Sequence, residues 1–164
     1  KKGGVKENTL FQFVFRSFYR LDNAGLGDEI KNKYFKLLSN KNVNLEMILC
    51  ELYEIPTKRN LKTIQFSFAT KLLHTIDNHL PIYDAEASRI LGVRVSGKTK
   101  DEKIKSCIGT YEKMKSIYLE IINDKEILKL IKKFKERFKL KDNEITNEKI
   151  LDFIIWSLGK LNNK

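Results

Sequence analysis

Lys71 and Asp84 are the two side chains whose types and positions best fit a chemical role. Both belong to the stretch SFATKLLHTIDNHLPIYDAEASRIL, residues 67–91, where Lys71 falls at the margin of an apolar helical stripe. Burial lowers the pKa of a lysine, and a neutral amine can act as a nucleophile or form an imine. The alternative is a structural lysine whose stem packs while its ammonium reaches water or pairs with Asp77 or Asp84. Spacing alone leaves both interpretations open.

The histidines and cysteines do not indicate a metal centre or a disulfide. His74 follows Lys71 on the same helical pattern, His79 falls in a loop, and neither is near an acidic cluster. Cys50 and Cys107 stand alone without a CxxC pair, which favours reduced thiols in a cytoplasmic protein, nucleoid-associated if bacterial. We expect no metal and no cofactor.

The composition is that of a folded globular protein. The chain has 164 residues, of which 41% are apolar and 32% charged. This length suffices for one domain with a proper core, or for two small lobes that share a cleft. We interpret residues 1–164 as a single helical domain and a monomer, with residues 1–6 disordered or derived from cloning.

The charge is strongly positive. Lysine and arginine number 32 against 21 aspartate and glutamate, a net charge of +11, which favours nucleic acid or another polyanionic partner. The alternative is that the extra lysines serve solubility alone. Apolar runs such as FQFVF and LDFIIWSL are far shorter than the roughly 20 residues that would span a bilayer, so we expect no membrane partner.

Hydrophobic periodicity predicts an all-α protein of about seven to eight helices. Helical spacing predicts a largely buried helix at Asn8–Leu21, and further helices at 27–38 and 45–52. From Leu61 the pattern continues to Ile76 or conceals a tight break near Ser67. Period-two alternation, the mark of strands, does not hold for long anywhere.

The second half of the chain repeats this helical pattern. Asp84 is a good N-cap for a helix that ends near Gly92, and Gly97 with KTKDE begins a long helix. Residues 125–141 form a basic amphipathic pattern, which fits a solvated surface better than a dedicated DNA-contacting helix. In the last helix, we expect an apolar group to dock onto the core, namely Ile150, Ile154, Trp156 and Leu158.

The order of residues from Ser67 onward resembles the helix-hairpin-helix DNA glycosylases, especially the 8-oxoguanine glycosylase branch. In that family the hairpin reads Gly, apolar, Gly, a polar residue and the catalytic lysine, and an aspartate follows at the start of the next helix. Asp84 takes that place here, and the hairpin pattern is occupied in order by Ser67, Phe68, Ala69, Thr70 and Lys71. The last helix, ILDFIIWSLGK, looks like the family's closing helix.

The resemblance implies a base-excision repair glycosylase and lyase that acts on damaged double-stranded DNA. Lys71 would attack C1′ of the damaged nucleotide, displace the base and leave an imine that permits strand cleavage. Asp84 would stabilise the developing positive charge or help to activate the nucleophile. The residues implied in DNA contact are Ser67, Phe68, Ala69, Thr70 and Arg89.

A flipped base also needs an aromatic side chain to stack against or to wedge the gap in the duplex. Four aromatic residues are candidates, although core packing is the better interpretation for most of them. They are Phe66, Phe68, Tyr83 and Trp156.

Two other classes of function stay open. Ser67 and Ala69 replace the glycines that let the family's hairpin approach a DNA phosphate, which motivates a non-catalytic, basic nucleic-acid-binding module. The other class is a helical protein-interaction domain whose charge serves solubility. The first would bind nucleic acid in a salt-dependent way without a covalent intermediate, and the second would not bind it.

Overall fold

Helices make up all the regular structure of the described chain. A computed structural model describes residues 4–5, 7–40 and 42–162. Within these ranges there are eight α-helices and one short 3-10 helix, which confirms the all-α class. The chain divides into two compact units, the first ending at Ile76 and the second beginning at Asp77. Of the predicted disordered end, only Gly4 and Val5 lie among the described residues.

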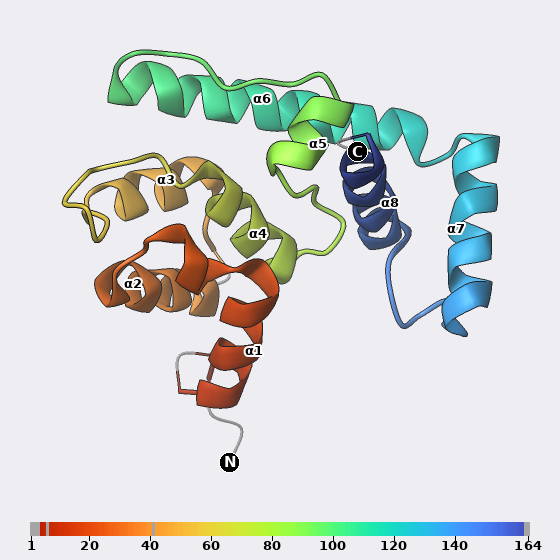
Figure 1. Cartoon of the computed structure of the whole chain (residues 1–164), viewed down its shortest axis with the longest axis horizontal. Coiled ribbons are helices and arrows are strands. Elements are labelled where there is room, and N and C mark those ends of the chain that lie inside the picture. Colours follow the sequence, from red (N-terminus) through yellow and green to blue (C-terminus); the bar gives the residue numbers. More distant parts are fainter. Residues whose placement is uncertain (1–3, 6, 41, 163–164) are drawn as a thin grey trace. The chain divides into compact units, whose positions relative to one another are not determined.

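The first unit contains the helices drawn in red to yellow-green in Figure 1. Their bounds are α1 Thr9–Tyr19, η1 Leu21–Ala24, α2 Asp28–Ser39, α3 Leu45–Tyr53 and α4 Phe66–Ile76. Asn8 and Asn44 cap α1 and α3, because each side chain accepts a hydrogen bond from a backbone N–H in the first turn. The starts of these helices are therefore set by local sequence.

The core of the first unit forms where α2, α3 and α4 contact one another. Tyr34 on α2 is fully buried, and its hydroxyl donates to the carbonyl of Phe68 on α4 at 3.0 Å. The ring of Phe15 contacts the rings of Tyr34 and Phe35, which attaches α1 to α2. The other fully buried large side chains of this unit are Leu21, Leu26, Ile30, Ile48, Leu49, Leu52, Leu72 and Thr70.

The expected burial of the first helix is wrong. Phe15 is the buried residue of α1, whereas four large apolar side chains are more than half exposed. They are Leu10, Phe13, Val14 and Phe18. The physical reason is that apolar residues surround this helix, while it packs on α2 through the Phe15 side only.

The break near Ser67 exists and lies just before Phe66. Residues 54–65 are not helical, so the apolar residues Leu61 and Ile64 precede the helix and are not part of it. A turn organises this segment, because the backbone N–H and the hydroxyl of Thr57 both donate to the carbonyl of Leu61. Helix α4 thus starts one residue before Ser67, and Ser67 to Lys71 form its first turns.

The second unit contains the helices drawn in green to blue in Figure 1. Their bounds are α5 Ala85–Ile90, α6 Lys100–Ile121, α7 Lys125–Phe138 and α8 Asn147–Leu161. Asp84 caps α5 as predicted, and Thr99 with Glu102 forms a capping box at the start of α6. Asp124 and Thr146 cap α7 and α8.

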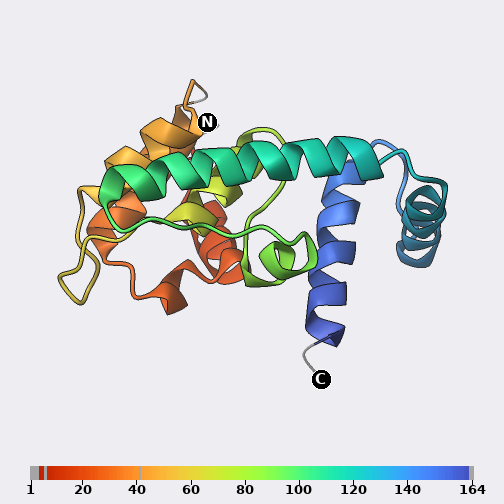
Figure 2. The same cartoon turned by 90° about the horizontal axis from the view of Figure 1, so that it is seen from above.

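An apolar cluster joins several helices of the second unit. Its buried members are Ala87, Val93, Met114, Tyr118, Leu151 and Ile155, drawn from α5, α6, α8 and the segment after α5. Helix α5 lies beside α8 in both views of the ribbon (Figures 1 and 2). Helix α7 also packs on α8, where the rings of Phe134 and Phe153 stack at 6.0 Å.

The last helix docks on the core, but not through all of the predicted residues. Ile150 is buried as expected, together with Leu151 and Ile155. Trp156 and Leu158 are instead 46% and 44% exposed. The helix is turned so that its Leu151 side faces α5 and α6, and Trp156 lies on the outside.

The cysteines and the lengths of the helices complete the description of the fold. Cys50 and Cys107 are both free thiols, in agreement with the sequence analysis. Among residues 4–5, 7–40 and 42–162, the helices all fall short of the length and apolar character needed to cross a bilayer.

Candidate functional site

Lys71 lies on α4 among aromatic rings. Its ammonium nitrogen is 4.8 Å from the centroid of the Phe68 ring and 5.8 Å from that of the Tyr19 ring. The side chain is partly buried. Aromatic faces attract a cation, so these two rings hold the amine in a defined direction. This position fits both a structural lysine and a nucleophile.

The first turns of α4 present few of the predicted DNA-contacting side chains. Ala69 and Thr70 are fully buried, and the Thr70 hydroxyl donates to the carbonyl of Ser67 at 3.1 Å. Ser67 and Phe68 are partly exposed. The first N–H groups of an α-helix have no acceptor within the helix, so this end of α4 offers backbone donors next to Ser67 and Phe68.

Asp84 belongs to the second unit, at the start of α5. Its carboxylate accepts a hydrogen bond from the N–H of Ala87 at 2.8 Å, as an N-cap should. The side chain is partly buried. Lys71 belongs to the first unit and Asp84 to the second, so their action on one substrate stays a prediction.

Arg89, a predicted DNA contact, bridges α5 and α8. Its guanidinium donates to the carboxylate of Glu86 and to the backbone carbonyl of Gly159. Lys160 pairs with the same carboxylate at 2.7 Å. These contacts give Arg89 a structural role. Its side chain is still 40% exposed, so part of it also faces solvent.

The four candidate base-stacking residues differ in exposure. Phe66 is buried, and Tyr83 packs against the apolar cluster of the second unit, which favours core packing for both. Trp156 is about half exposed, with the Lys160 nitrogen 5.5 Å from its ring centroid. Phe68 contacts Lys71. Phe68 and Trp156 therefore keep ring surface available.

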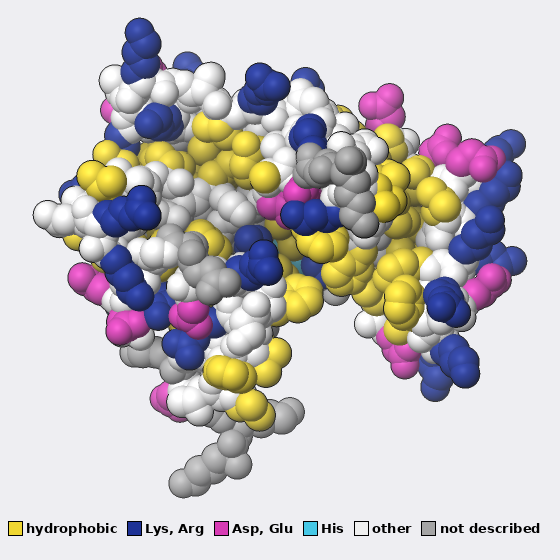
Figure 3. All heavy atoms as spheres, viewed as in Figure 1, with side chains coloured by type: hydrophobic (Ala, Val, Ile, Leu, Met, Phe, Trp, Pro, Cys, Tyr) yellow, Lys and Arg dark blue, Asp and Glu magenta, His cyan; other side chains and the backbone are white. Residues whose placement is uncertain are grey.

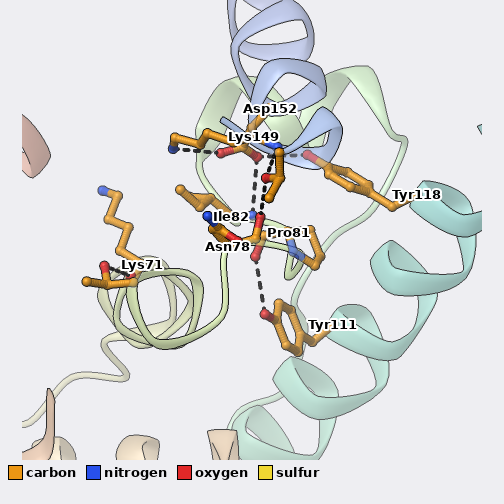
Figure 4. Close-up of polar contacts among 10 residues, drawn as sticks. Lys71, Asn78, Pro81, Ile82, Tyr111, Tyr118, Lys149 and Asp152 are labelled. Carbon is orange, nitrogen blue, oxygen red and sulfur yellow. Dashed lines mark hydrogen bonds and ion pairs between the residues drawn. The ribbon is translucent and has the colours of Figure 1, made fainter. Parts of the chain in front are cut away.

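A buried polar cluster in the second unit was missed by sequence analysis. The Asp152 carboxylate pairs with Lys149 at 3.4 Å and accepts a hydrogen bond from the Tyr118 hydroxyl at 2.8 Å (Figure 4). Burial raises the pKa of Tyr118, and the nearby Asp152 carboxylate adds to this. Burial lowers the pKa of Lys149, and the charges of Asp152 and Asp84 partly oppose that shift.

The spacing of two charged residues in the last helix could have indicated this cluster. Lys149 and Asp152 are one helical turn apart in the stretch EKILDF, within a helix whose neighbouring residues are apolar. A charged pair on the docking side of an amphipathic helix indicates a buried ion pair.

No family model, curated protein or solved structure matches the chain.

Other polar features lie away from Lys71 and Asp84. A hollow of about 620 Å³ in the second unit is lined by twelve residues, mostly polar, that include Asn78, His79 and Thr146. Another of about 790 Å³ in the first unit is lined by residues of α2, α3 and the segment after α3. Within the described ranges, the histidine, cysteine and acidic side chains form no group of three or more that could hold a metal ion.

His79 gives a testable pH dependence. Its Nδ1 lies 3.1 Å from a carboxylate oxygen of Glu148, and this contact raises the pKa of His79 above its usual value. The pair therefore stabilises the fold at pH values below about 6.5, and the contribution is lost as the pH rises through the folded-state pKa. We expect an NMR titration to give His79 a pKa above its usual value of about 6.5, and Glu148→Gln to lower that pKa. An unchanged titration in Glu148→Gln would contradict the contact.

The predicted basic helix is confirmed in outline. Helix α7 buries Ile131 and turns most of its lysines outward, with Lys129 and Lys132 side chains 66% and 80% exposed. Figure 3 shows Lys and Arg side chains along its outer edge, at the right of the view. Glu126 and Glu136 pair with two of these lysines, so the surface is basic but not uniformly so.

Proposed function

We propose that this protein is a DNA glycosylase and lyase of the helix-hairpin-helix type, which removes a damaged base from duplex DNA by means of Lys71. The observation that carries the proposal is the pair of helix starts. Helix α4 begins just before the Ser67 to Lys71 sequence, and α5 is capped by Asp84 itself. Asp84 at the start of α5 agrees with the place of the aspartate in the resemblance. Ser67 to Lys71 instead lie inside α4 and do not form the hairpin turn that the resemblance implies.

The proposed reaction proceeds through an imine. The lone pair of Lys71 Nζ forms a bond to C1′ while the bond from C1′ to the base breaks. The base leaves with the electron pair of the broken bond and takes up one proton that the amine nitrogen loses. The sugar ring then opens as the C1′–O4′ bond breaks, O4′ takes up the second proton of the nitrogen, and a Lys71 imine remains. Loss of a C2′ proton then breaks the bond to the 3′ phosphate. Asp84 stabilises the positive charge that develops on the sugar.

The surroundings of Lys71 suit such an amine. Phe68 and Tyr19 direct it, and the Tyr34 hydroxyl fixes the Phe68 carbonyl, so that the turn carrying Phe68 is anchored to α2. A nucleophile held in one direction loses less entropy on the way to the transition state. The net charge of +11 adds attraction for DNA.

The test is borohydride trapping with a panel of duplexes that carry 8-oxoguanine, uracil or an abasic site. Borohydride reduces an imine to a stable amine, so a covalent protein–DNA band reports the intermediate. We expect a band with the abasic duplex and with at least one of the damaged bases. Absence of a band with every duplex would reject the glycosylase and lyase activity.

The second candidate is a non-catalytic nucleic-acid-binding module. It is favoured by the basic outer surface of α7 and by Ser67 and Ala69 in place of the family's glycines. This alternative predicts binding to duplex DNA that weakens steeply with salt and shows little sequence preference, without any trapped band. Absence of binding at low salt would instead favour a helical protein-interaction domain.

A further inference from the structure

The carboxylate of Asp152 receives donors from three different parts of the second unit. The backbone N–H of Ile82 donates to Oδ1 at 3.3 Å, and the Tyr118 hydroxyl donates to the same oxygen at 2.8 Å. Lys149 pairs with Oδ2 at 3.4 Å. Figure 4 shows these contacts converging from α8, α6 and the segment before α5.

This group is well shielded from water. The side chains of Asp152 and Lys149 are only 10% and 14% exposed, and Tyr118 is buried. A buried carboxylate is stable only when it is paired and hydrogen-bonded, and here its donors satisfy that need. The three bonds are therefore difficult to exchange for water, and they hold Ile82 in place.

Ile82 is two residues before Asp84, and the same segment is fixed at further points. The Tyr111 hydroxyl donates to the carbonyl of Pro81 at 3.2 Å, and the Thr146 hydroxyl donates to that of Asn78 at 3.0 Å. The chain that leads to Asp84 thus has its backbone bound by side chains of α6 and of the α8 cap. Of these three contacts, the one from Asp152 is at the residue nearest to Asp84 in the chain.

Charge connects the two carboxylates as well. The negative charges of Asp152 and Asp84 both raise the pKa of Lys149, against the effect of burial. The ammonium that Asp152 holds therefore also attracts Asp84. The position of Asp84 depends on the backbone contact at Ile82, because that contact fixes the chain two residues before Asp84.

We propose that Asp152 is a positioning residue for Asp84, acting through the Ile82 backbone. The inference rests on the proposed function, in which Asp84 stabilises the charge that develops on the sugar. Displacement of a catalytic group by about 1 Å can lower a rate about 100-fold. Asp152 would therefore affect the chemical step without touching DNA.

The experiment compares Asp152→Ala with Asp152→Asn. The asparagine amide oxygen can still accept from Ile82 and Tyr118, whereas alanine leaves both donors without this acceptor. Asp142→Ala is the matched control, because Asp142 is an almost fully exposed carboxylate of the same unit that pairs with Lys135. The readouts are the single-turnover rate of strand cleavage on an abasic-site duplex, the Kd for that duplex, and thermal unfolding.

We expect Asp152→Ala to lower the single-turnover rate about 10- to 100-fold, with less than about a threefold change in Kd. Asp152→Asn should recover most of the rate, and Asp142→Ala should match the parent protein. All rates are measured well below the unfolding midpoint of each variant. A purely structural role would change the midpoint and leave the rate of the folded protein unchanged.

Two results would overturn the positioning role. One is a folded Asp152→Ala protein with the parent rate, and the other is an Asp152→Asn protein as slow as Asp152→Ala. If the parent protein shows neither cleavage nor trapping, the proposed function is rejected. Amide hydrogen exchange then tests separately whether Asp152 positions the segment at Asp84. Faster exchange at Ile82 and Ala87 in Asp152→Ala than in Asp152→Asn would support it, and equal exchange in the two variants would reject it.

Discussion

Replacement of Lys71 by glutamine is expected to abolish borohydride trapping on the abasic-site duplex. Glutamine keeps much of the length of the side chain but has no nucleophilic amine, so no imine can form at this position. We expect a loss of at least about 10³-fold in the amount trapped per unit time. The measurement is the covalent band on a denaturing gel, with equal concentrations of the two proteins.

The variant should fold, so that the loss can be assigned to chemistry. Lys71 contributes two ring contacts, and contacts of a cation with an aromatic face at partly exposed sites are worth about 0.5–1 kcal/mol. Lys62→Gln is the matched control, because Lys62 also lies over an aromatic ring, that of Tyr53, in the same unit. Equal trapping by Lys71→Gln and the parent protein would exclude Lys71 as the nucleophile and direct attention to other amines.

The helices whose ends carry a local signal could be predicted from the sequence. The side chain of Asp84 caps α5, and the KTKDE stretch contains the Thr99 and Glu102 capping box of α6. A cap is a contact between residues three positions apart, so it can be recognised without knowledge of the rest of the fold. The break before Phe66 was more difficult, because the apolar period runs through it from Leu61.

The buried face of each helix could not be predicted with the same success. Helix α1 has apolar residues on several sides, and the contact of Phe15 with α2 selects the buried side. In α8, Trp156 fits the apolar pattern and yet lies outside, because the Leu151 side packs on α5 and α6. Which side of a helix is buried depends on the partner helix, and the periodicity of one helix gives no information about that partner.

In the candidate site, too, some residues could be found from the sequence and others only from the fold. Sequence order selected Lys71 and Asp84 as candidates, and the structure confirms the predicted capping of α5 by Asp84. Sequence order was not enough to find Asp152, whose importance comes from the donors Ile82 and Tyr118. These three residues are far apart in the chain, and only folding brings them together.

The second large effect is expected at Gly159, where α8 approaches α5 closely. A methyl group at Gly159 would lie 2.6 Å from Cβ and 3.1 Å from Cα of Glu86. Contacts this short require the two helices to move apart, because Glu86 Cβ and Cα belong to the rigid part of that residue. The movement would also weaken the hydrogen bond from Arg89 to the Gly159 carbonyl.

We therefore expect Gly159→Ala to lower the free energy of unfolding by about 1–3 kcal/mol, the usual cost of overpacking. Gly109→Ala is the matched control, since Gly109 lies inside α6 and a methyl group there would meet nothing within 4 Å. That substitution should raise the free energy of unfolding by about 0.5–1 kcal/mol, because alanine is the better helix former.

Urea unfolding of the three proteins checks both signs. One chemical change, hydrogen to methyl on a helical glycine, is expected to stabilise α6 and destabilise the contact between α5 and α8. If both variants were more stable than the parent protein, α5 and α8 would not approach as closely as described. The outcome also concerns Arg89, which donates to the Gly159 carbonyl. A large loss of stability in Gly159→Ala would show that the contact between α5 and α8, to which Arg89 belongs, stabilises the fold in addition to any contact of Arg89 with DNA.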